Sequence, residues 1–352
     1  MSQARADFAI VGATLQARLV AGLLASAHGR SVVLVGASQA AYRLPRTLDL
    51  SVAPITRPDS FALLHSALPD LQGLLKKLGA RKAWIRLDPV FFASGQGGRE
   101  ILAHMRHMAL GFGHTVERLP AVALGRDRDG LVWRDAVLLQ RSLLEPLLDG
   151  WLDDLGVRRL QAARLDLADN GSAQLGTGSE EIAVAQTVLA DDEAILAHLP
   201  APAWPALFTR QAGASLLTEP TAPLQAPVLL DLDVGITLLQ QVGRGLIAIG
   251  PGPLDPFAAA VRGLLGPDRK VQQVGQTAFT RIVTSDNAPA VGRVDGTGPD
   301  VLAGFGSLAA FLAPAIARWL TGGATPAENA WMAARLVNRA LPAPVAEWKA
   351  VS

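Results

Sequence analysis

The stretch from residue 7 to residue 36 constrains the fold more than any other part of the chain. Phe8–Val11 is a short apolar run that stops at Gly12, a residue able to turn the chain sharply after a buried strand. Small and apolar residues recur at helical spacing from Thr14 to Ala27, and Val32–Val35 is a second apolar run. This order predicts a strand, a tight turn, a helix and a parallel second strand.

Such a βαβ unit is typical of dinucleotide-binding folds, in which N–H groups at the helix N-terminus bind a diphosphate. The usual fingerprint G-x-G-x-x-G/A is met by Gly12 and Ala17, but Thr14 takes the place of the middle glycine. Gly36 stands where a carboxylate for the ribose is expected. A plain βαβ unit that binds no nucleotide therefore stays open as an alternative.

Composition excludes several classes of function. The chain has 352 residues, half of them apolar, which predicts a substantial core and about two domains. Its net charge is +1 with both signs well mixed, so no basic footprint for nucleic acid or an anionic membrane is visible. The absence of cysteine excludes disulfides, iron–sulfur ligation and thiol nucleophiles. We expect a small molecule as the partner.

The sequence shows no signal segment and no membrane span. A short polar lead runs directly into the first strand, so we expect a cytoplasmic location. Ser307–Leu320 is the most apolar helix candidate, but it is short for a span and carries Arg318, which indicates a buried helix. His104 and His107 lie three residues apart without a third ligand, and we expect ordinary helix residues there rather than a metal site.

The loop at 37–58 carries arginines that could replace the missing carboxylate. In a dinucleotide-binding fold this loop passes the adenosine side, so Arg43 or Arg46 could contact phosphate or ribose. Solvated surface arginines are the competing interpretation.

The middle of the chain changes from parallel to antiparallel character, which predicts a second domain. We expect a helix over residues 59–79, strands at 82–87 and 90–92, and a helix over 100–110. A hairpin of 119–123 with 131–133, a long helix over 136–155, and a hairpin across Asp169-Asn170-Gly171 follow. Strands at hairpin spacing then fill residues 212–249 before a helix over 256–265.

The C-terminal part carries the most specific motif. Read as R-x-x-T-x-D-x-x-P-x-I/V-G, a strand ending in A-G and a helix containing A-P, it resembles the D-amino-acid oxidase and glycine oxidase family of FAD-dependent oxidoreductases. The matching residues are Arg281, Thr284, Asp286, Pro289, Gly292, Ala303, Gly304, Ala313 and Pro314. The resemblance covers both ends of the chain well and the middle only by topology.

The resemblance implies an α/β fold with a Rossmann-like FAD-binding domain and an interleaved substrate domain built on a mixed, largely antiparallel sheet. It implies FAD as the cofactor and hydride transfer from the carbon bearing an amine, which needs orientation and electrostatics from the protein. Arg281 corresponds to the arginine that binds a substrate carboxylate; a structural ion pair is the alternative role. We expect the helix after Ser307 to direct its N-terminus at the flavin. The predicted cofactor-binding residues are Gly12, Thr14, Ala17, Arg43, Arg46, Gly304, Gly306, Ser307 and Leu308.

Departures from the family pattern gather on the nucleotide side and keep two functions open. Besides Thr14 and Gly36, Asp191-Asp192 stands where the family has A-x-G, which places negative charge near the expected diphosphate. The first function is an FAD-dependent oxidoreductase acting on a small amine or amino acid. The second is a cofactor-degenerate relative that serves as a non-catalytic subunit, maturation factor or binding protein. An aromatic-ring hydroxylase is disfavoured because the motif G-D-x-x-H is missing from residues 303–307.

We expect a discontinuous FAD-binding domain at 1–58, 130–198 and 278–352, with the substrate domain at 59–129 and 199–277. Pro-rich residues 199–205 indicate a crossing between the two. Neither nucleic acid nor a membrane is expected as a partner, and a homo-oligomer or a partner subunit stays open.

Overall fold

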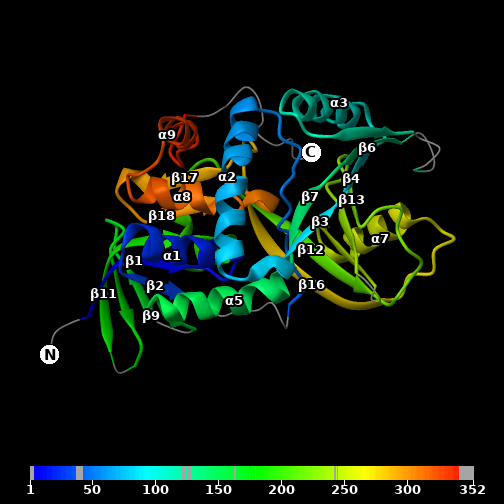
Figure 1. Cartoon of the computed structure of the whole chain (residues 1–352). Coiled ribbons are helices and arrows are strands. Elements are labelled where there is room, and N and C mark those ends of the chain that lie inside the picture. Colours follow the sequence, from blue (N-terminus) through cyan, green and yellow to red (C-terminus); the bar gives the residue numbers. More distant parts are fainter. Residues whose placement is uncertain are drawn as a thin grey trace.

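Two eight-stranded sheets organise the chain, which we describe from a computed structural model (Figure 1). The structure describes residues 4–36, 43–120, 124, 128–161, 164–178, 180–241, 243 and 245–340. In Figure 1 the first sheet lies on the left with helices α1, α5 and α8, and the second sheet lies on the right with α3 and α7.

The first sheet is parallel at its centre. Its main strand order is β17-β18-β11-β1-β2-β8, and the β9–β10 hairpin pairs with β11. Strands β18, β11, β1, β2 and β8 run parallel to one another, whereas β17, β10 and β9 are antiparallel to their neighbours. The bounds are β1 Ala4–Val11, β2 Val32–Val35, β8 Arg158–Leu160, β9 Arg164–Leu167, β10 Ala173–Gly176, β11 Glu181–Leu189, β17 Ala290–Arg293 and β18 Asp300–Ala303.

Side chains of β1 alternate between two cores, as a strand buried on both faces requires. Ile10 joins the core that includes helix α1 (Leu15–His28), and Ala9 and Val11 join the core on the opposite face. Helix α1 packs against α5 (Arg141–Asp154) and α8 (Ala313–Leu320). A Cβ on Gly22 would lie 2.1 Å from the Trp151 ring, so this glycine lets α5 approach α1 closely.

The second sheet is antiparallel except where β13 meets β4. Its order is β16-β12-β15-β14-β13-β4-β6-β5. Long strands β12 and β16 pair side by side and extend towards the first sheet (Figure 1). The bounds are β4 Val90–Ala93, β5 Val116–Leu119, β6 Asp129–Trp133, β12 Phe208–Thr218, β13 Val228–Asp231, β14 Thr237–Gln240, β15 Leu246–Pro251 and β16 Gln273–Thr284.

The remaining elements connect and cover the sheets. Strands β3 (Trp84–Leu87) and β7 (Ala136–Leu139) form a separate antiparallel pair. The other helices are α2 Pro58–Lys77, α3 Gln96–Gly111, α6 Asp192–His198, α7 Leu254–Leu265 and α9 Pro326–Ala333, with 3₁₀ turns η1 Ala80–Ala83, η2 Ala201–Ala203, η3 Val294–Gly296 and η4 Gly306–Leu308.

The predicted mixed α/β architecture is confirmed, and β2 and the β9–β10 hairpin lie where the sequence predicts them. Two predicted helices are wrong at their starts. Residues 136–139 form strand β7, because this apolar segment pairs with β3 before α5 begins. The helix predicted from Ser307 begins only at Ala313, and η4 with a turn precedes it.

The hairpin predicted before residue 133 pairs different residues. Strand β6 pairs with β5, which ends at Leu119, and residues 121–123 and 125–127 of the predicted hairpin lie outside the described residues. Strand β6 belongs to the second sheet although residues from 130 onward were expected in the first domain. The domain boundaries themselves stay a proposal.

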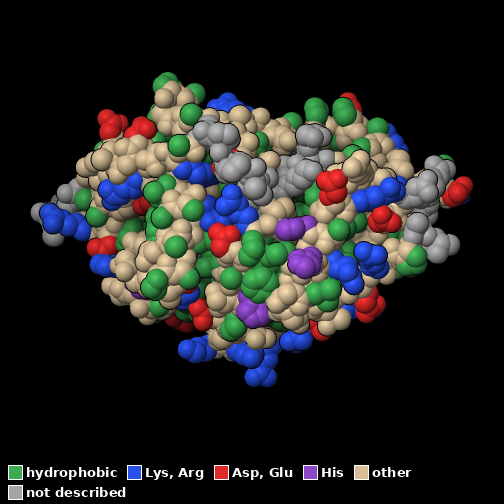
Figure 2. All heavy atoms as spheres, turned by 90° about the horizontal axis from the view of Figure 1, so that it is seen from above, with side chains coloured by type: hydrophobic (Ala, Val, Ile, Leu, Met, Phe, Trp, Pro, Cys, Tyr) green, Lys and Arg blue, Asp and Glu red, His purple; other side chains and the backbone are tan. Residues whose placement is uncertain are grey.

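On the face seen in Figure 2, basic and acidic side chains are interspersed among hydrophobic ones over most of the surface, and several basic side chains lie together along its lower edge. None of the described helices combines the length and hydropathy that a membrane crossing needs. The cytoplasmic location stays a prediction.

Candidate functional site

A cavity of about 350 Å³ opens at the carboxyl ends of the central parallel strands. This is the edge at which open α/β sheets bind ligands, and the volume lies within the usual range for small-molecule sites. Strand β16 of the second sheet closes it from the other side. The walls are formed by residues 13–16 after β1, 43–54 of the following loop, Arg141 of α5, 191–193 after β11, 279–287 of β16 and its turn, and 302–309 after β18.

Thr14 caps helix α1 with its own side chain. Its hydroxyl accepts a hydrogen bond from the Ala17 N–H at 3.3 Å, so the residue in the place of the middle glycine serves the helix. Thr14 lines the cavity, whereas Ala17 is fully buried.

Asp191 holds the turn between β1 and α1. Its Oδ2 accepts the Ala13 N–H at 2.7 Å, and its Oδ1 accepts the Ala194 N–H at 2.9 Å as the cap of α6. A Cβ on Gly12 would lie 2.7 Å from the same Oδ2, so glycine is what lets the carboxyl reach the turn. Burial raises the pKa of Asp191, and the two N–H bonds oppose that rise.

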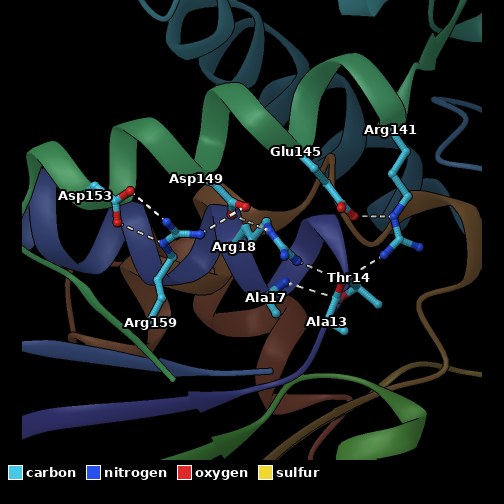
Figure 3. Close-up of polar contacts among 9 residues, drawn as sticks. All are labelled: Ala13, Thr14, Ala17, Arg18, Arg141, Glu145, Asp149, Asp153 and Arg159. Carbon is cyan, nitrogen blue, oxygen red and sulfur yellow. Dashed lines mark hydrogen bonds and ion pairs between the residues drawn. The ribbon is translucent and has the colours of Figure 1, made fainter. Parts of the chain in front are cut away.

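Two arginines hold the carbonyl of the same residue, Ala13, in the next peptide (Figure 3). Arg18 and Arg141 each donate to the Ala13 carbonyl at 2.9 Å, from α1 and α5 respectively. Arg18 also pairs with Asp149 at 2.9 Å, and Arg141 pairs with the buried Glu145. Figure 3 shows these charged groups between α1 and α5. Together with Asp191 at the start of α6, they fix the orientation of the turn from three elements.

Gly36 leaves no room for the carboxylate that usually binds a ribose. Its φ is +150°, and a Cβ there would lie 2.4 Å from the Gly12 carbonyl oxygen. Side chains are therefore excluded from this position by backbone rather than by a movable group. Neither Gly12 nor Gly36 is among the described residues that line the cavity.

The two predicted loop arginines reach the cavity but are already paired. Arg46 donates to Glu193 Oε1 at 2.6 Å and Arg43 donates to the same oxygen at 3.2 Å. Arg46 also lies over the Phe279 ring, 5.4 Å from its centroid. A hydrogen bond of 2.6 Å from the Ser215 hydroxyl to the Pro45 carbonyl holds the loop against β12.

Arg281 and Asp192 both line the cavity, and their charges interact. Burial lowers the pKa of Arg281, and the charge of Asp192 opposes that shift. Burial raises the pKa of Asp192 to about 6, against a backbone hydrogen bond from Ile282 and the charge of Arg281. The site therefore holds a cationic group and a carboxyl that titrates near neutral pH.

The loop after β18 presents backbone to the cavity. Gly304 and Gly306 have φ of +72° and +54°, a conformation that favours glycine, and Ser307 follows them in η4. The Ser307 carbonyl accepts the Leu50 N–H at 3.1 Å, which ties this loop to the segment around residue 50. Because α8 begins at Ala313, the sequence-based argument that a helix N-terminus follows Ser307 directly is wrong.

Most predicted site residues come together at the cavity. Thr14, Arg43, Arg46, Arg281, Gly304, Gly306 and Ser307 line it. Gly12, Ala17 and Leu308 are not among its described lining; Leu308 is buried in the core. Asp286 of the C-terminal motif is a structural residue, since its carboxylate accepts two hydrogen bonds of 2.8 Å from Arg339.

Asp49 and Arg141 are among the charged residues of the cavity wall that sequence reasoning missed. Burial raises the pKa of Asp49 to about 7, with Arg141 opposing and Glu145 adding to the shift. Asp49 lies in a loop without periodicity, and Arg141 was expected inside a longer helix. The strand preceding α5 brings Arg141 to the helix start beside the turn. No local signal in the sequence indicates either placement.

No protein-family model and no curated protein matches the chain. Several solved structures do match it. L-proline dehydrogenase from P. horikoshii superposes with a TM-score of 0.72 at 14% identity, covering 94% of this chain and 97% of that one. Glycine oxidase from Bacillus cereus superposes with a TM-score of 0.69 at 14% identity, covering 96% of this chain and 100% of that one. Iminodiacetate oxidase from Chelativorans sp. superposes with a TM-score of 0.64 at 18% identity, covering 90% of this chain and 94% of that one.

The chain has the glycine oxidase-like fold. The resemblance inferred from the C-terminal motif is thereby confirmed for the architecture, over nearly the whole length of each chain. At these identities the comparison shows the fold, and the site has to be judged on its own residues.

In this glycine oxidase-like fold the residues present fit one half of FAD and not the other. The cavity, with glycine backbone at 304 and 306 and with Arg281, fits a flat ring system and a carboxylate beside it. The diphosphate half does not fit as the turn stands, because the Ala13 N–H is bound to Asp191. The ribose half lacks its carboxylate because Gly36 cannot carry one.

Proposed function

We propose that the protein is a flavin-dependent oxidoreductase that oxidises a C–N bond of a small amine or amino acid, with FAD as the cofactor. The observation that carries the proposal is the cavity. It lies at the ligand-binding edge of a parallel sheet, between the two sheets of a glycine oxidase-like fold, and the C-terminal motif lines it. The solved neighbours named above are oxidases and a dehydrogenase of amino compounds, which supports this class of substrate.

Arg281 is the proposed substrate-binding residue. Its guanidinium is largely removed from water and shares the cavity with the carboxyl of Asp192. A planar guanidinium binds a carboxylate through two parallel hydrogen bonds, which would fix an amino acid by one end. Asp192, when ionised, offers a negative charge to an amine. Together they provide the two charges that complement an amino acid.

The chemistry that a bound flavin supplies is acceptance of a hydride from the carbon bearing the amine. The protein's own contribution in this proposal is orientation by Arg281 and exclusion of water by the walls of β16 and the 304–307 loop. Neither a catalytic triad nor a metal is required for it.

A second candidate is a cofactor-degenerate relative that binds a small amino compound and acts beside an active enzyme. The observation that favours it is the bond between Asp191 and the Ala13 N–H, together with the closed position at Gly36. The cavity would then serve binding alone.

Anaerobic reduction separates the two candidates. The protein is loaded with FAD, mixed without oxygen with a panel of small amino acids and amines, and followed by visible absorbance. Loss of the flavin absorbance with at least one member of the panel is the expected result. Binding of panel members in calorimetry without any change in the absorbance would favour the second candidate.

A further inference from the structure

The acidic start of helix α6 occupies the groups that would bind the diphosphate of a dinucleotide. Asp191 takes the N–H of the turn, at 2.7 Å from Ala13, and packs against Gly12. Two residues further on, Glu193 takes the guanidinium groups of Arg46 and Arg43. The Ala13 N–H, Arg43 and Arg46 are groups of the described region that could bind an anion, and all three are bound to carboxylates of the chain itself.

The two carboxylates, those of Asp191 and Glu193, should oppose an incoming diphosphate unequally. Asp191 is partly buried and uses both oxygens, one for the turn and one as the cap of α6. Glu193 is 41% exposed and Arg43 is 47% exposed, so those ion pairs are screened and easily exchanged. An incoming phosphate can therefore exchange with Glu193 at low cost, whereas it has to displace Asp191 from two partly buried hydrogen bonds.

The turn is also held on its carbonyl side. Arg18, 2% exposed, and Arg141 both donate to the Ala13 carbonyl (Figure 3). The arginines thus hold the Ala13–Thr14 peptide, and Asp191 holds the preceding Gly12–Ala13 peptide through its N–H, so two successive planar peptides of the turn are fixed. The contact between Asp191 and the turn is therefore supported by residues of α1, α5 and the start of α6.

We propose that Asp191 is a built-in competitor for the cofactor diphosphate. A flavin without a diphosphate meets no such competition, whereas FAD or any nucleoside diphosphate enters against the Asp191 carboxylate. This inference deepens the proposed function and depends on it for the identity of the displaced group. It also says which acid matters, since Asp192 lies against β16 through Ile282 and not on the turn.

The test compares three probes on four proteins. The probes are riboflavin, FAD and ADP, the last carrying a diphosphate without a flavin. The proteins are the parent, Asp191→Gly, Asp191→Asn and the control Asp233→Gly. Asp233 also accepts two backbone N–H bonds, from Ser94 and Gly95, but it lies outside the described lining of the cavity. Fluorescence titration measures the flavins and calorimetry measures ADP.

We expect Asp191→Gly to bind FAD and ADP about tenfold more tightly than the parent, with riboflavin affinity unchanged. Asp191→Asn keeps an oxygen on the turn but loses the charge, so a gain of about threefold is expected. Asp233→Gly should match the parent. Far-ultraviolet circular dichroism and thermal unfolding confirm that each variant is folded, and the Asn variant, which retains the cap, carries the test if the Gly variant is not.

Unchanged FAD and ADP affinity in the folded Asp191 variants would overturn the proposal, and so would an equal gain in Asp233→Gly or an equal gain for riboflavin. The proposed function fails separately. If ADP gains affinity in Asp191→Gly while no protein in the set binds riboflavin or FAD, Asp191 is a competitor for a diphosphate in a site that takes no flavin.

Discussion

Single residues decide which parts of a dinucleotide this chain can hold. Gly36 was visible in the sequence as a missing carboxylate, and the structure gives the physical reason: the position faces the Gly12 carbonyl. Thr14 was visible as a missing glycine and proves to be a helix cap. The sequence analysis placed Asp191-Asp192 near the expected diphosphate, but it could not predict that Asp191, 178 residues away in the chain, accepts the Ala13 N–H. A motif shows that a residue is unusual, but only the packing shows what it contacts.

Restoring a side chain at position 36 should destabilise the fold. For Gly36→Ala we expect a loss of about 3 kcal/mol in the free energy of unfolding, because the new Cβ meets backbone at 2.4 Å. Gly29→Ala is the control, since Gly29 has φ of +61° but open space around it, and about 1 kcal/mol is expected there. Urea unfolding measures both. Equal losses would mean that backbone strain, and not the contact with Gly12, makes position 36 a glycine.

Arg281 should act on the substrate rather than on the cofactor. In Arg281→Ala we expect KM for an amino acid to rise by about 100-fold while flavin affinity changes less than threefold, because a carboxylate loses two charge-assisted hydrogen bonds. Steady-state kinetics and flavin titration provide the two readouts. Arg210→Ala is the control, since Arg210 stacks on Trp204 outside the described lining. Parallel losses of both affinities in Arg281→Ala would assign this arginine to the fold.

At the scale of elements, helix α5 does more than cover the sheet. It contacts α1 through Gly22 and Trp151 and brings Arg141 to the turn after β1. Sequence periodicity predicts that residues 141–154 are helical, but it merges strand β7 into the same helix because apolar residues 136–139 fit either structure. The strand pairing with β3, a contact from 50 residues earlier in the chain, decides between them. Local elements were therefore largely predictable, and their boundaries were not.

The charged contacts that α5 makes with α1 and with β8 should differ strongly in what they contribute to stability. Arg18→Met should lower the free energy of unfolding by about 2 kcal/mol, because loss of the buried guanidinium removes one partner each from Asp149 and the Ala13 carbonyl. Arg159→Met removes two ion pairs, with Asp149 and Asp153, of an arginine that is 34% exposed, and less than 1 kcal/mol is expected. Chemical denaturation of both variants checks this. A larger loss from Arg159 than from Arg18 would contradict the assignment of the turn's support to the buried arginine.

At the scale of the whole molecule, the cavity exists because strands from two sheets meet. The parallel sheet supplies the turn, the α6 start and the 304–307 loop, and the antiparallel sheet supplies β16 with Arg281. The C-terminal motif predicted the fold, and three of its residues, Arg281, Thr284 and Gly304, line this wall. Asp49 and Arg141 lay beyond prediction, since nothing local marks a loop acid or a helix start as facing a ligand.

Acids buried at this junction should make stability fall as pH rises. The pKa of Asp49 is raised by burial to about 7 and that of Asp192 to about 6, so each keeps its proton in the folded state above pH 4 and loses it on unfolding. The free energy of unfolding should therefore decrease between about pH 4 and pH 7 through these groups. Asp49→Asn should exceed the parent by about 2 kcal/mol at pH 8 and match it near pH 4. Urea unfolding across this range measures the difference, and a difference independent of pH would contradict it.

The binding of flavin in the cavity is the central claim, and a spectroscopic titration tests it most directly. Purified protein is titrated into riboflavin and into FAD, and the visible absorption spectrum of each flavin is followed. We predict saturable spectral changes with both, with riboflavin bound more tightly than FAD because Asp191 opposes the diphosphate. Spectra of both flavins that remain those of the free molecules at every protein concentration would contradict the account.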